Sequence, residues 1–209
     1  MINFDHLSST DIAHCLQHHA FANTHDIPAE LAAASHKEAG VLIPFTRIAG
    51  TWHLVFIRRP QSLRDRHSGQ VAFAGGKRES NDPNIIHTAL REAEEEIGLK
   101  PQDVTLLGQL GTHHSISHYR ITPIVGSIPW PYDFRLNPTE VARLFTIPLT
   151  WLAHPPHHEI RQHHLNSIST PIPVVYFQEY DKEILWGATA RMTLSLVHCL
   201  QHGHQAYAA

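Results

Sequence analysis

Glutamates are concentrated in one short stretch of this sequence, REAEEEIGL at residues 91–99, where four of the five residues from 92 to 96 are glutamates. Only 17% of the whole chain is charged, so the negative charge is gathered locally. Carboxylate oxygens are the ligands that hard divalent cations such as Mg²⁺ and Mn²⁺ prefer in proteins. An exposed helix surface has the same composition, so the stretch by itself indicates either a cation site or a solvated helix face.

A helix is predicted to carry these glutamates, because residues 82–98 have apolar side chains at helical spacing and helix signals at both ends. Asp82 is expected to be the N-cap, Pro83 fits the first helical position, and Gly98 fits the C-terminal stop. At about 100° per residue the apolar residues form one stripe. The expected buried face consists of Ile86, Leu90, Ala93 and Ile97, with Ala89 at its edge.

Three of the glutamates share one flank of this predicted helix. Glu92, Glu95 and Glu96 are related by i, i+3 and i+4 spacing, and Arg91 is placed to pair with Glu95. Like charges at this spacing repel, and the C-terminal half of a helix disfavours anions because of the helix dipole. A bound divalent cation would offset both costs, so a second feature that points to a metal would favour the cation site.

The second feature is the glycine pair Gly75-Gly76, which precedes the helix and allows the backbone to approach a ligand closely. Together, the glycine turn, the loop and the carboxylate helix resemble the Nudix box, G-x5-E-x7-R-E-U-x-E-E-x-G-U, in which U is aliphatic. Residues 91–99 match its second half throughout. In the first half, Gly76 lies one residue farther from Arg91 than in the general box, and Asp82 stands near the position of the box glutamate.

The resemblance implies hydrolysis of a diphosphate linked to a nucleoside, with Mg²⁺ or Mn²⁺ as cofactor. The implied metal ligands are Glu92, Glu95, Glu96 and the carbonyl oxygen of Gly76. The implied catalytic residues are Glu92, Glu95, Arg91 and Glu140. In these roles Glu92 acts as the general base or positions it, and Arg91 orients Glu95. Glu140 precedes a predicted strand and is a candidate outer base or extra ligand; an ordinary surface-turn glutamate is an equal alternative.

The segment in front of the box resembles a narrower family, the Nudix coenzyme A pyrophosphatases. Residues 54–79, LVFIRRPQSLRDRHSGQVAFAGGKRE, are similar to its motif of an aliphatic strand, an arginine, Leu-Arg, a histidine, Gly-Gln and Phe-Pro-Gly-Gly. Ala74 stands where the family has proline, and one additional residue leaves open whether Arg64 or Arg66 takes the family's basic position. Further similarity extends the match to about residues 39–195, through segments 113–128, 137–155 and 184–192.

The narrower resemblance implies that coenzyme A or acyl-coenzyme A is cleaved to 3′,5′-ADP and 4′-phosphopantetheine or its acyl form. Arginine binds phosphate in a bidentate manner, which suits such a substrate. The residues expected to bind substrate are Arg58, Arg59, Arg64, Arg66, Gln70, Lys77 and Tyr119. Two alternatives stay open: a Nudix diphosphatase acting on ADP-ribose, NADH or nucleoside triphosphates, and a Nudix-fold binding protein without catalysis. The presence of all three box glutamates argues against the second.

The remaining segments predict an α+β fold, with a Nudix-like mixed β-sheet sandwiched between helices (α/β/α). Residues 39–48 and 52–60 are β-rich and separated by a short turn, which is typical of a hairpin. Further strands are expected at 70–76, 104–113, 119–128 and 173–180, a strand or short helix at 141–155, and helices at 8–19, 29–39 and within 184–202. The predicted organisation is a helical extension at 1–37, a Nudix hydrolase domain at 38–203 and a tail at 204–209.

Composition restricts the classes of partner. The net charge of −3 gives no sign of nucleic acid or an acidic membrane surface. The two cysteines, Cys15 and Cys199, form no disulfide framework, and neither a secretory signal nor a membrane-length apolar run is present. We therefore expect a cytoplasmic protein with a small-molecule substrate, coenzyme A or a related nucleoside diphosphate derivative. No nucleic acid or membrane partner is expected, and a homodimer is left open.

Histidine is unusually frequent, with 20 residues. The segment HEIRQH at residues 158–163 resembles a zinc-binding helix, but His158 and His163 are five positions apart and would not share a helix face. The scattered histidines therefore predict a surface that titrates near neutrality, not a zinc site or a metal-buffering protein.

Overall fold

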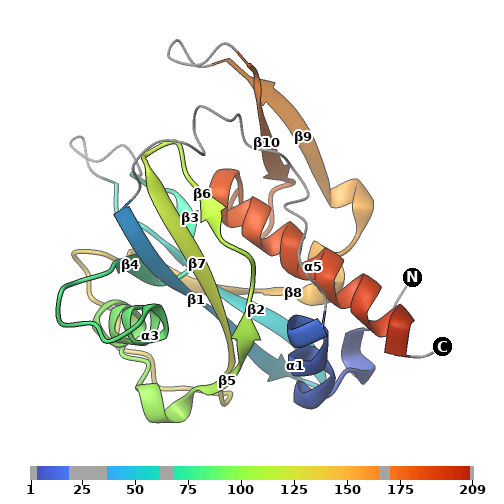
Figure 1. Ribbon diagram of the computed structural model, residues 1–209, viewed down its shortest axis with the longest axis horizontal. Helices are drawn as coiled ribbons and strands as arrows, with labels where there is room; N and C mark the ends of the chain where they lie inside the picture. Colours follow the sequence, from blue (N-terminus) through green and yellow to red (C-terminus); the bar gives the residue numbers. More distant parts are fainter. Residues whose placement is uncertain (1–3, 19–36, 62–67, 165–169, 208–209) are drawn as a thin grey trace.

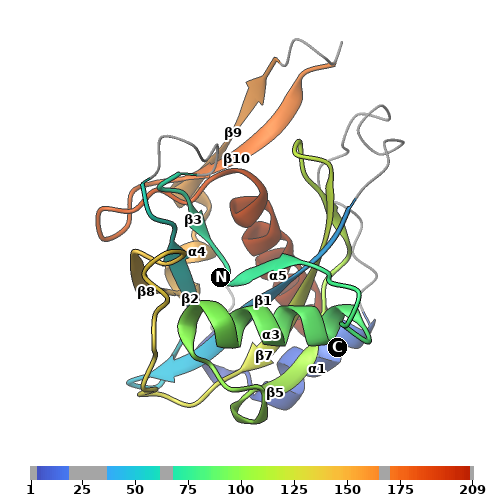
Figure 2. The same ribbon diagram turned by 90° about the vertical axis from the view of Figure 1, so that its left-hand side faces the viewer.

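The computed structural model describes residues 4–18, 37–61, 68–164 and 170–207, with side chains described as far as residue 203. A mixed β-sheet forms the centre, and helices cover both of its faces (Figures 1 and 2). Helix α3 (Ile85–Ile97) lies on one face. Helices α1 (Ser9–His18) and α5 (Gly187–Tyr207) lie on the other face and pack against each other. The predicted α+β fold with an α/β/α arrangement is thus confirmed.

Strand β1 (Lys37–Ile48) is the centre of the sheet and pairs with a long strand on each side. It forms an antiparallel hairpin with β2 (Thr51–Arg58). The turn between them has positive φ angles at Ala49 (49°) and Gly50 (87°), which matches the twist of a tight hairpin. On its other side β1 runs parallel to β7 (Tyr119–Ser127), which arrives from a distant part of the chain. The predicted hairpin is confirmed, and the parallel pair makes the sheet mixed.

Shorter strands extend the sheet in the order β3-β2-β1-β7-β5, with β4 on β1, β6 on β7 and β8 on β2. Their bounds are β3 (Val71–Ala72), β4 (Gly75–Lys77), β5 (Thr105–Gln109), β6 (His113–His114) and β8 (Arg143–Pro148). Strands β9 (His158–His163) and β10 (Ile172–Phe177) form a separate antiparallel pair that projects from the body near the start of α5 (Figure 1). Short helices complete the fold: α4 (Leu149–Leu152) and the 3₁₀ turns Phe4–His6, Pro101–Asp103 and Pro155–His157.

Two hydrophobic cores lie on opposite faces of the sheet, because successive strand side chains point to opposite faces. In β2, Leu54 and Phe56 belong to the core under α1 and α5, whereas Val55 and Ile57 belong to the core under α3. Burial on both faces accounts for the nearly continuous apolar sequence of these strands. Helix α3 is therefore attached to a sheet that is packed on both faces.

The N-terminal helix α1 is part of the main core. It packs on α5 and β5, and Ile12, Cys15 and Leu16 are buried. Before it, the carbonyl oxygen of Leu7 accepts a hydrogen bond from Trp52 Nε1 at 2.8 Å. The boundaries predicted for the extension and the tail stay predictions, although Lys37 already belongs to β1 and α5 continues to Tyr207.

Several segments differ from the sequence prediction. Residues 70–76 contribute two short strands, β3 and β4, because the chain leaves β2 and crosses to β1. Residues 141–155 form both a strand and a short helix. Residues 158–163 form strand β9, so the comparison with a zinc helix does not apply. The helix predicted at 29–39 falls largely outside the described residues, and its last three residues belong to β1. In the described part of the chain, no helix is long and apolar enough to cross a membrane.

Candidate active site on helix α3

Helix α3 is held directly against β1 and β4 by glycines. A Cβ atom at Gly40 would lie 2.7 Å from the backbone oxygen of Ile85, so only glycine permits this approach. Gly40 pairs with Gly76 of β4, which brings the glycine pair of the sequence motif beneath the same helix. Helix α3 ends as predicted at Gly98, which has a φ of 68° and donates its N–H to carbonyl oxygens of the last turn.

The start of α3 differs from the prediction. Asn84 is the N-cap, and its side-chain oxygen accepts a hydrogen bond from the His87 N–H at 2.9 Å. The first helical residue is Ile85, so neither Asp82 nor Pro83 has the predicted capping position. The physical reason is that the Asp82 carboxylate binds the Arg91 side chain on the side of the helix and cannot cap its end.

Asp82 is buried, with 4% of its surface exposed, and forms a two-pronged ion pair with Arg91. Arg91 Nε donates to Asp82 Oδ1 at 3.0 Å, and Arg91 Nη2 donates to Asp82 Oδ2 at 3.0 Å. The Thr88 hydroxyl and the Glu79 N–H also donate to Asp82 Oδ2, each at 2.9 Å. Hydrogen bonding by Arg91 is the main reason that the pKa of Asp82 lies well below its usual range. This network fastens the loop that follows β4 to α3.

Arg91 also reaches the glutamates. Its Nη1 donates to Glu95 Oε2 at 2.9 Å, as the i, i+4 spacing predicted, and lies 3.0 Å from Glu92 Oε1. Glu92 is mostly covered, whereas 55% of the Glu95 side chain is exposed. One guanidinium therefore links the loop acid Asp82 to two of the box glutamates and fixes their side chains.

Glu96 has a different environment from the other two glutamates. Only 3% of its surface is exposed, and its Oε2 accepts a hydrogen bond from the Gly75 N–H at 3.1 Å. Burial, together with the negative charges of Glu92 and Glu140, raises the pKa of Glu96 to about 8. Burial also raises the pKa of Glu92. Burial is thus the largest cause of both shifts, although Arg91 lowers the pKa of Glu92 and Arg59 lowers the pKa of Glu96.

The buried face of α3 is rotated relative to the sequence prediction. Ala89, Ala93 and Ile97 are buried as expected, whereas Ile86 and Leu90 are only half-buried. Thr88 and Glu96 take the buried positions instead. The glycines beneath the helix explain the rotation, because they leave room for a carboxylate to reach the backbone of β4.

Gly76 lies directly against Glu92. A Cβ atom added at Gly76 would lie 2.5 Å from Glu92 Oε1 and 2.6 Å from Glu92 Oε2. Any side chain at this position would displace the carboxylate. Gly75 therefore contacts Glu96, and Gly76 contacts Glu92.

We expect Gly76→Ala to lower kcat by at least about tenfold while the protein stays folded, because a misplacement of about 1 Å at a reacting centre carries a large kinetic cost. Steady-state kinetics and thermal unfolding would measure the two effects. Gly50→Ala is the matched control: it strains a positive φ of 87° in the hairpin turn, where nothing lies within 4 Å of the new methyl group. The control should lose stability and keep kcat. Unchanged kcat in Gly76→Ala would contradict the positioning of Glu92 by this backbone.

A cleft of about 430 Å³ opens beside Gly75 and Gly76. Four of the residues expected to bind substrate line it: Arg59, Gln70, Lys77 and Tyr119. Arg58 does not line it, and its guanidinium lies 3.4 Å from Glu183. Arg64 and Arg66 fall outside the described residues. Glu140 is half-buried and close enough to raise the pKa of both Glu92 and Glu96, which brings it together with the box glutamates.

The opposite wall of the cleft comes from segments to which the sequence analysis assigned no role. These residues are Ser115, Ser117, Ile172, Val174, Trp186, Thr189, Arg191 and Met192. Most of the wall belongs to β10 and the start of α5, which are far from the Nudix box in sequence. The similarity noted at residues 184–192 is the sequence signal that pointed to this region.

The donor set suits a hard divalent cation. Carboxylates and a backbone carbonyl oxygen are the ligands that Mg²⁺ and Mn²⁺ accept, and the buried charge on Glu96 would be stabilised by a cation. Within the described residues no group of three or more His, Cys, Asp or Glu side chains is arranged to hold a metal ion. Glu95 pairs with Arg91 instead of joining Glu92 and Glu96.

Comparisons with known proteins identify the family of this chain. Residues 36–167 match the NUDIX domain family. The chain is 36% identical over 176 residues to a Nudix hydrolase called NudL from Photorhabdus laumondii subsp. laumondii, a match that covers 83% of this chain and 90% of that protein. It is 41% identical over 159 residues to NudL from Yersinia pestis (strain Pestoides F), covering 76% of this chain and 77% of the relative.

Solved structures have the same fold. The MutT protein from Methanosarcina mazei Go1 has a TM-score of 0.50 at 14% identity, over 85% of this chain and 99% of that chain. A MutT/nudix family protein from Enterococcus faecalis has a TM-score of 0.51 at 10% identity, over 86% of this chain and 70% of that chain. With the family match, the curated relatives and the glutamate helix in agreement, this chain belongs to the Nudix hydrolase family.

Proposed function

We propose that this Nudix hydrolase cleaves the diphosphate bond of coenzyme A or acyl-coenzyme A, giving 3′,5′-ADP and 4′-phosphopantetheine or its acyl form. The observation that carries the proposal is the buried Glu96 carboxylate beside Gly75–Gly76, at the edge of a cleft that Arg59 and Lys77 also line. Carboxylates that could bind a cation and cationic side chains that could bind phosphate thus lie at the same cleft.

Mg²⁺ or Mn²⁺ is the proposed cofactor. Glu92, Glu96 and the Gly76 carbonyl oxygen would hold it, with Glu95 as a further ligand if it leaves Arg91. When bound, such a cation supplies neutralisation of the charge that develops on the phosphoryl oxygens.

The chain's own residues then have separable roles. Glu92 has a raised pKa, which makes it a suitable base to take the proton of the attacking water or to position the base that does so. Arg91 holds Glu92 and Glu95 in place and does not line the cleft. Arg59 and Lys77 would bind phosphate oxygens, and Tyr119 and Gln70 would contact the rest of the substrate. Glu140 is the proposed outer base or additional ligand.

A substrate panel tests this proposal. With Mg²⁺ or Mn²⁺ present, we expect a higher kcat/KM for coenzyme A or an acyl-coenzyme A than for ADP-ribose, NADH or nucleoside triphosphates. Chromatography should resolve 3′,5′-ADP as a product. Faster hydrolysis of ADP-ribose would replace the coenzyme A assignment with another Nudix diphosphatase activity, and no hydrolysis of any substrate would favour a binding protein.

A further inference from the structure

Arg191 is a cation on the far wall of the cleft, away from the Nudix box. It lies in the second turn of α5 and lines the same cleft as Gly76 and Lys77. Arg59, by contrast, also lines the cleft, and its positive charge lowers the pKa of the box residue Glu96. The positive charge of Arg191 instead helps to lower the pKa of His113, a residue of β6. The cleft therefore has positive charge at two separate places.

The guanidinium of Arg191 has no anionic partner in the described part of the chain. Its Nη2 donates a hydrogen bond to the backbone oxygen of His114. Its Nε is buried and has no hydrogen-bond partner within the described residues. Burial lowers the pKa of Arg191, and no described carboxylate counteracts this shift. A half-buried guanidinium whose Nε is buried and unpaired is costly unless an anion pairs with it.

The groups around Arg191 favour an anion as its partner. Gly187, Ala188 and Thr189, the first turn of α5, line the cleft next to it. The first turn of a helix carries backbone N–H groups without helical partners and the positive end of the helix dipole. The hydroxyl groups of Ser115 and Ser117 stand on the same cleft wall.

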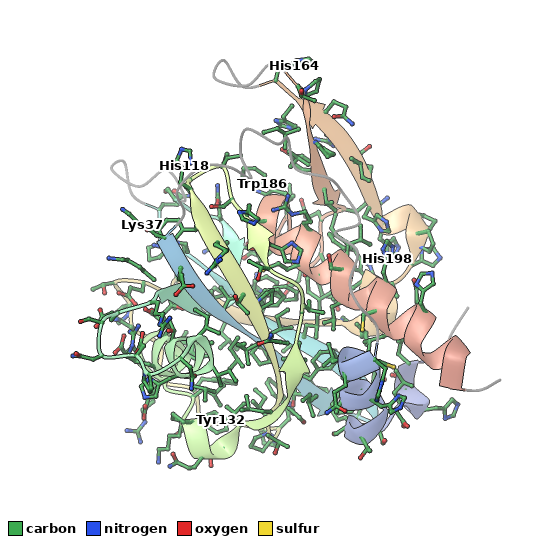
Figure 3. The ribbon with its side chains drawn as sticks, viewed as in Figure 1. Lys37, His118, Tyr132, His164, Trp186 and His198 are labelled. Atoms are coloured by element: carbon green, nitrogen blue, oxygen red, sulfur yellow. The ribbon has the colours of Figure 1, made fainter. Side chains whose placement is uncertain are left out.

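An aromatic surface borders this end of the cleft. Trp186 immediately precedes α5, remains 37% exposed and lines the cleft, and Figure 3 shows it where α5 begins. Its ring is stacked on Tyr176 of β10, with ring centres 5.6 Å apart and planes inclined by 6°. A cation and an exposed flat ring that line the same cleft suit a ligand that carries both a phosphate and a planar or apolar group.

We propose that Arg191 and the first turn of α5 bind a phosphate monoester group of the substrate, separate from the diphosphate that is cleaved at α3. This inference rests on the proposed function, in which the bound group is the 3′-phosphate of coenzyme A. It adds a specificity-determining residue from outside the Nudix box and its flanking motif. It also explains why a guanidinium is retained in the cleft without a carboxylate partner.

The kinetic test compares coenzyme A with 3′-dephospho-coenzyme A. We expect Arg191→Gln to lower kcat/KM for coenzyme A by about tenfold to a hundredfold, the loss of one charge-assisted hydrogen bond, and to spare 3′-dephospho-coenzyme A. Arg191→Lys should retain part of the preference because the charge remains. Arg120→Gln is the matched control: Arg120 pairs with Glu38 and does not line the cleft, so the substrate preference should persist. An equal loss on both substrates would overturn the proposal and leave Arg191 a structural link to β6.

A binding experiment separates the two proposals. Calorimetric titration with 3′,5′-ADP and with 5′-AMP reports the monoester site without turnover. Preference of the wild type for 3′,5′-ADP, lost in Arg191→Gln, would support the site even if coenzyme A is not hydrolysed. Hydrolysis of coenzyme A with no preference over the dephospho form and no binding preference would overturn the site and leave the proposed function intact. If Arg191→Gln does not fold, the wild-type preferences and Arg191→Lys give the same decision.

Discussion

Replacement of Glu96 by glutamine is expected to lower kcat by about a hundredfold to a thousandfold, the cost of removing one preorganised electrostatic group. Glu96 is 3% exposed and is held by the Gly75 N–H, so glutamine fits the same space and removes only the charge. Steady-state kinetics with Mg²⁺ or Mn²⁺ would measure the loss. Glu94→Gln is the matched control, because Glu94 is exposed on the same helix and should retain normal kcat.

The same variant should change the response of stability to metal. Because the folded-state pKa of Glu96, about 8, lies above its unfolded value, ionised Glu96 destabilises the metal-free protein, and stability is lost as pH rises from about 4 to 8. At pH 8 without metal, Glu96→Gln should therefore melt at a higher temperature than the wild type. Added Mg²⁺ or Mn²⁺ should stabilise the wild type more than the variant. Equal metal-induced shifts together with near-normal turnover would contradict the role of Glu96 as a ligand.

Asp82→Ala is expected to lower the free energy of unfolding by about 3 kcal/mol at neutral pH, because removing one partner of a buried ion pair leaves the other charge uncompensated. Asp82 accepts two hydrogen bonds from Arg91 and one each from Thr88 and Glu79. Arg91 would also hold Glu92 and Glu95 less firmly, so kcat should fall. Urea unfolding would measure the stability change.

The pH dependence of this effect has a defined sign. The pKa of Asp82 is lowered by its hydrogen bonds with Arg91, so its stabilisation is present above the unfolded pKa of about 4 and is lost as pH falls below it. The difference between wild type and Asp82→Ala should therefore shrink in acid. Asp133→Ala, at an exposed loop position, is the control and should be nearly neutral. A pH-independent difference would show that Asp82 contributes through packing and not through its charge.

Local sequence patterns determined the elements that carry the chemistry. Gly98 ends α3 because only glycine adopts its φ of 68° without strain, and the i, i+4 spacing of Arg91 and Glu95 led to their ion pair. Two β-rich segments on either side of a short turn identified the β1–β2 hairpin, since turn residues between two such segments are a local signal. These features depend on neighbours in the chain, so the sequence contains the information for them.

Tertiary structure decided how α3 is rotated, and with it which glutamate is buried. A helical wheel placed Ile86 and Leu90 on the buried face, but Gly40 lets the start of the helix lie directly on β1, and the N–H of Gly75 accounts for the buried position of Glu96. Asp82 was expected to cap the helix, yet Arg91, nine residues later, draws its carboxylate to the helix side. Both outcomes follow from contacts between segments that a local pattern does not relate.

The composition of the cleft is also a tertiary result. Arg59 and Lys77 lie close to the Nudix box in sequence, but the motif pointed equally to Arg58, which does not line the cleft. Arg191 and Trp186 reach the same cleft only because α5 crosses the opposite face of the sheet and begins beside β6 and β10 (Figure 1). The sequence by itself therefore determined the glutamate helix, whereas the packing of α5 decided which residues lie across the cleft from Gly76 and Lys77, because Trp186 and Arg191 are more than 100 positions farther along the chain.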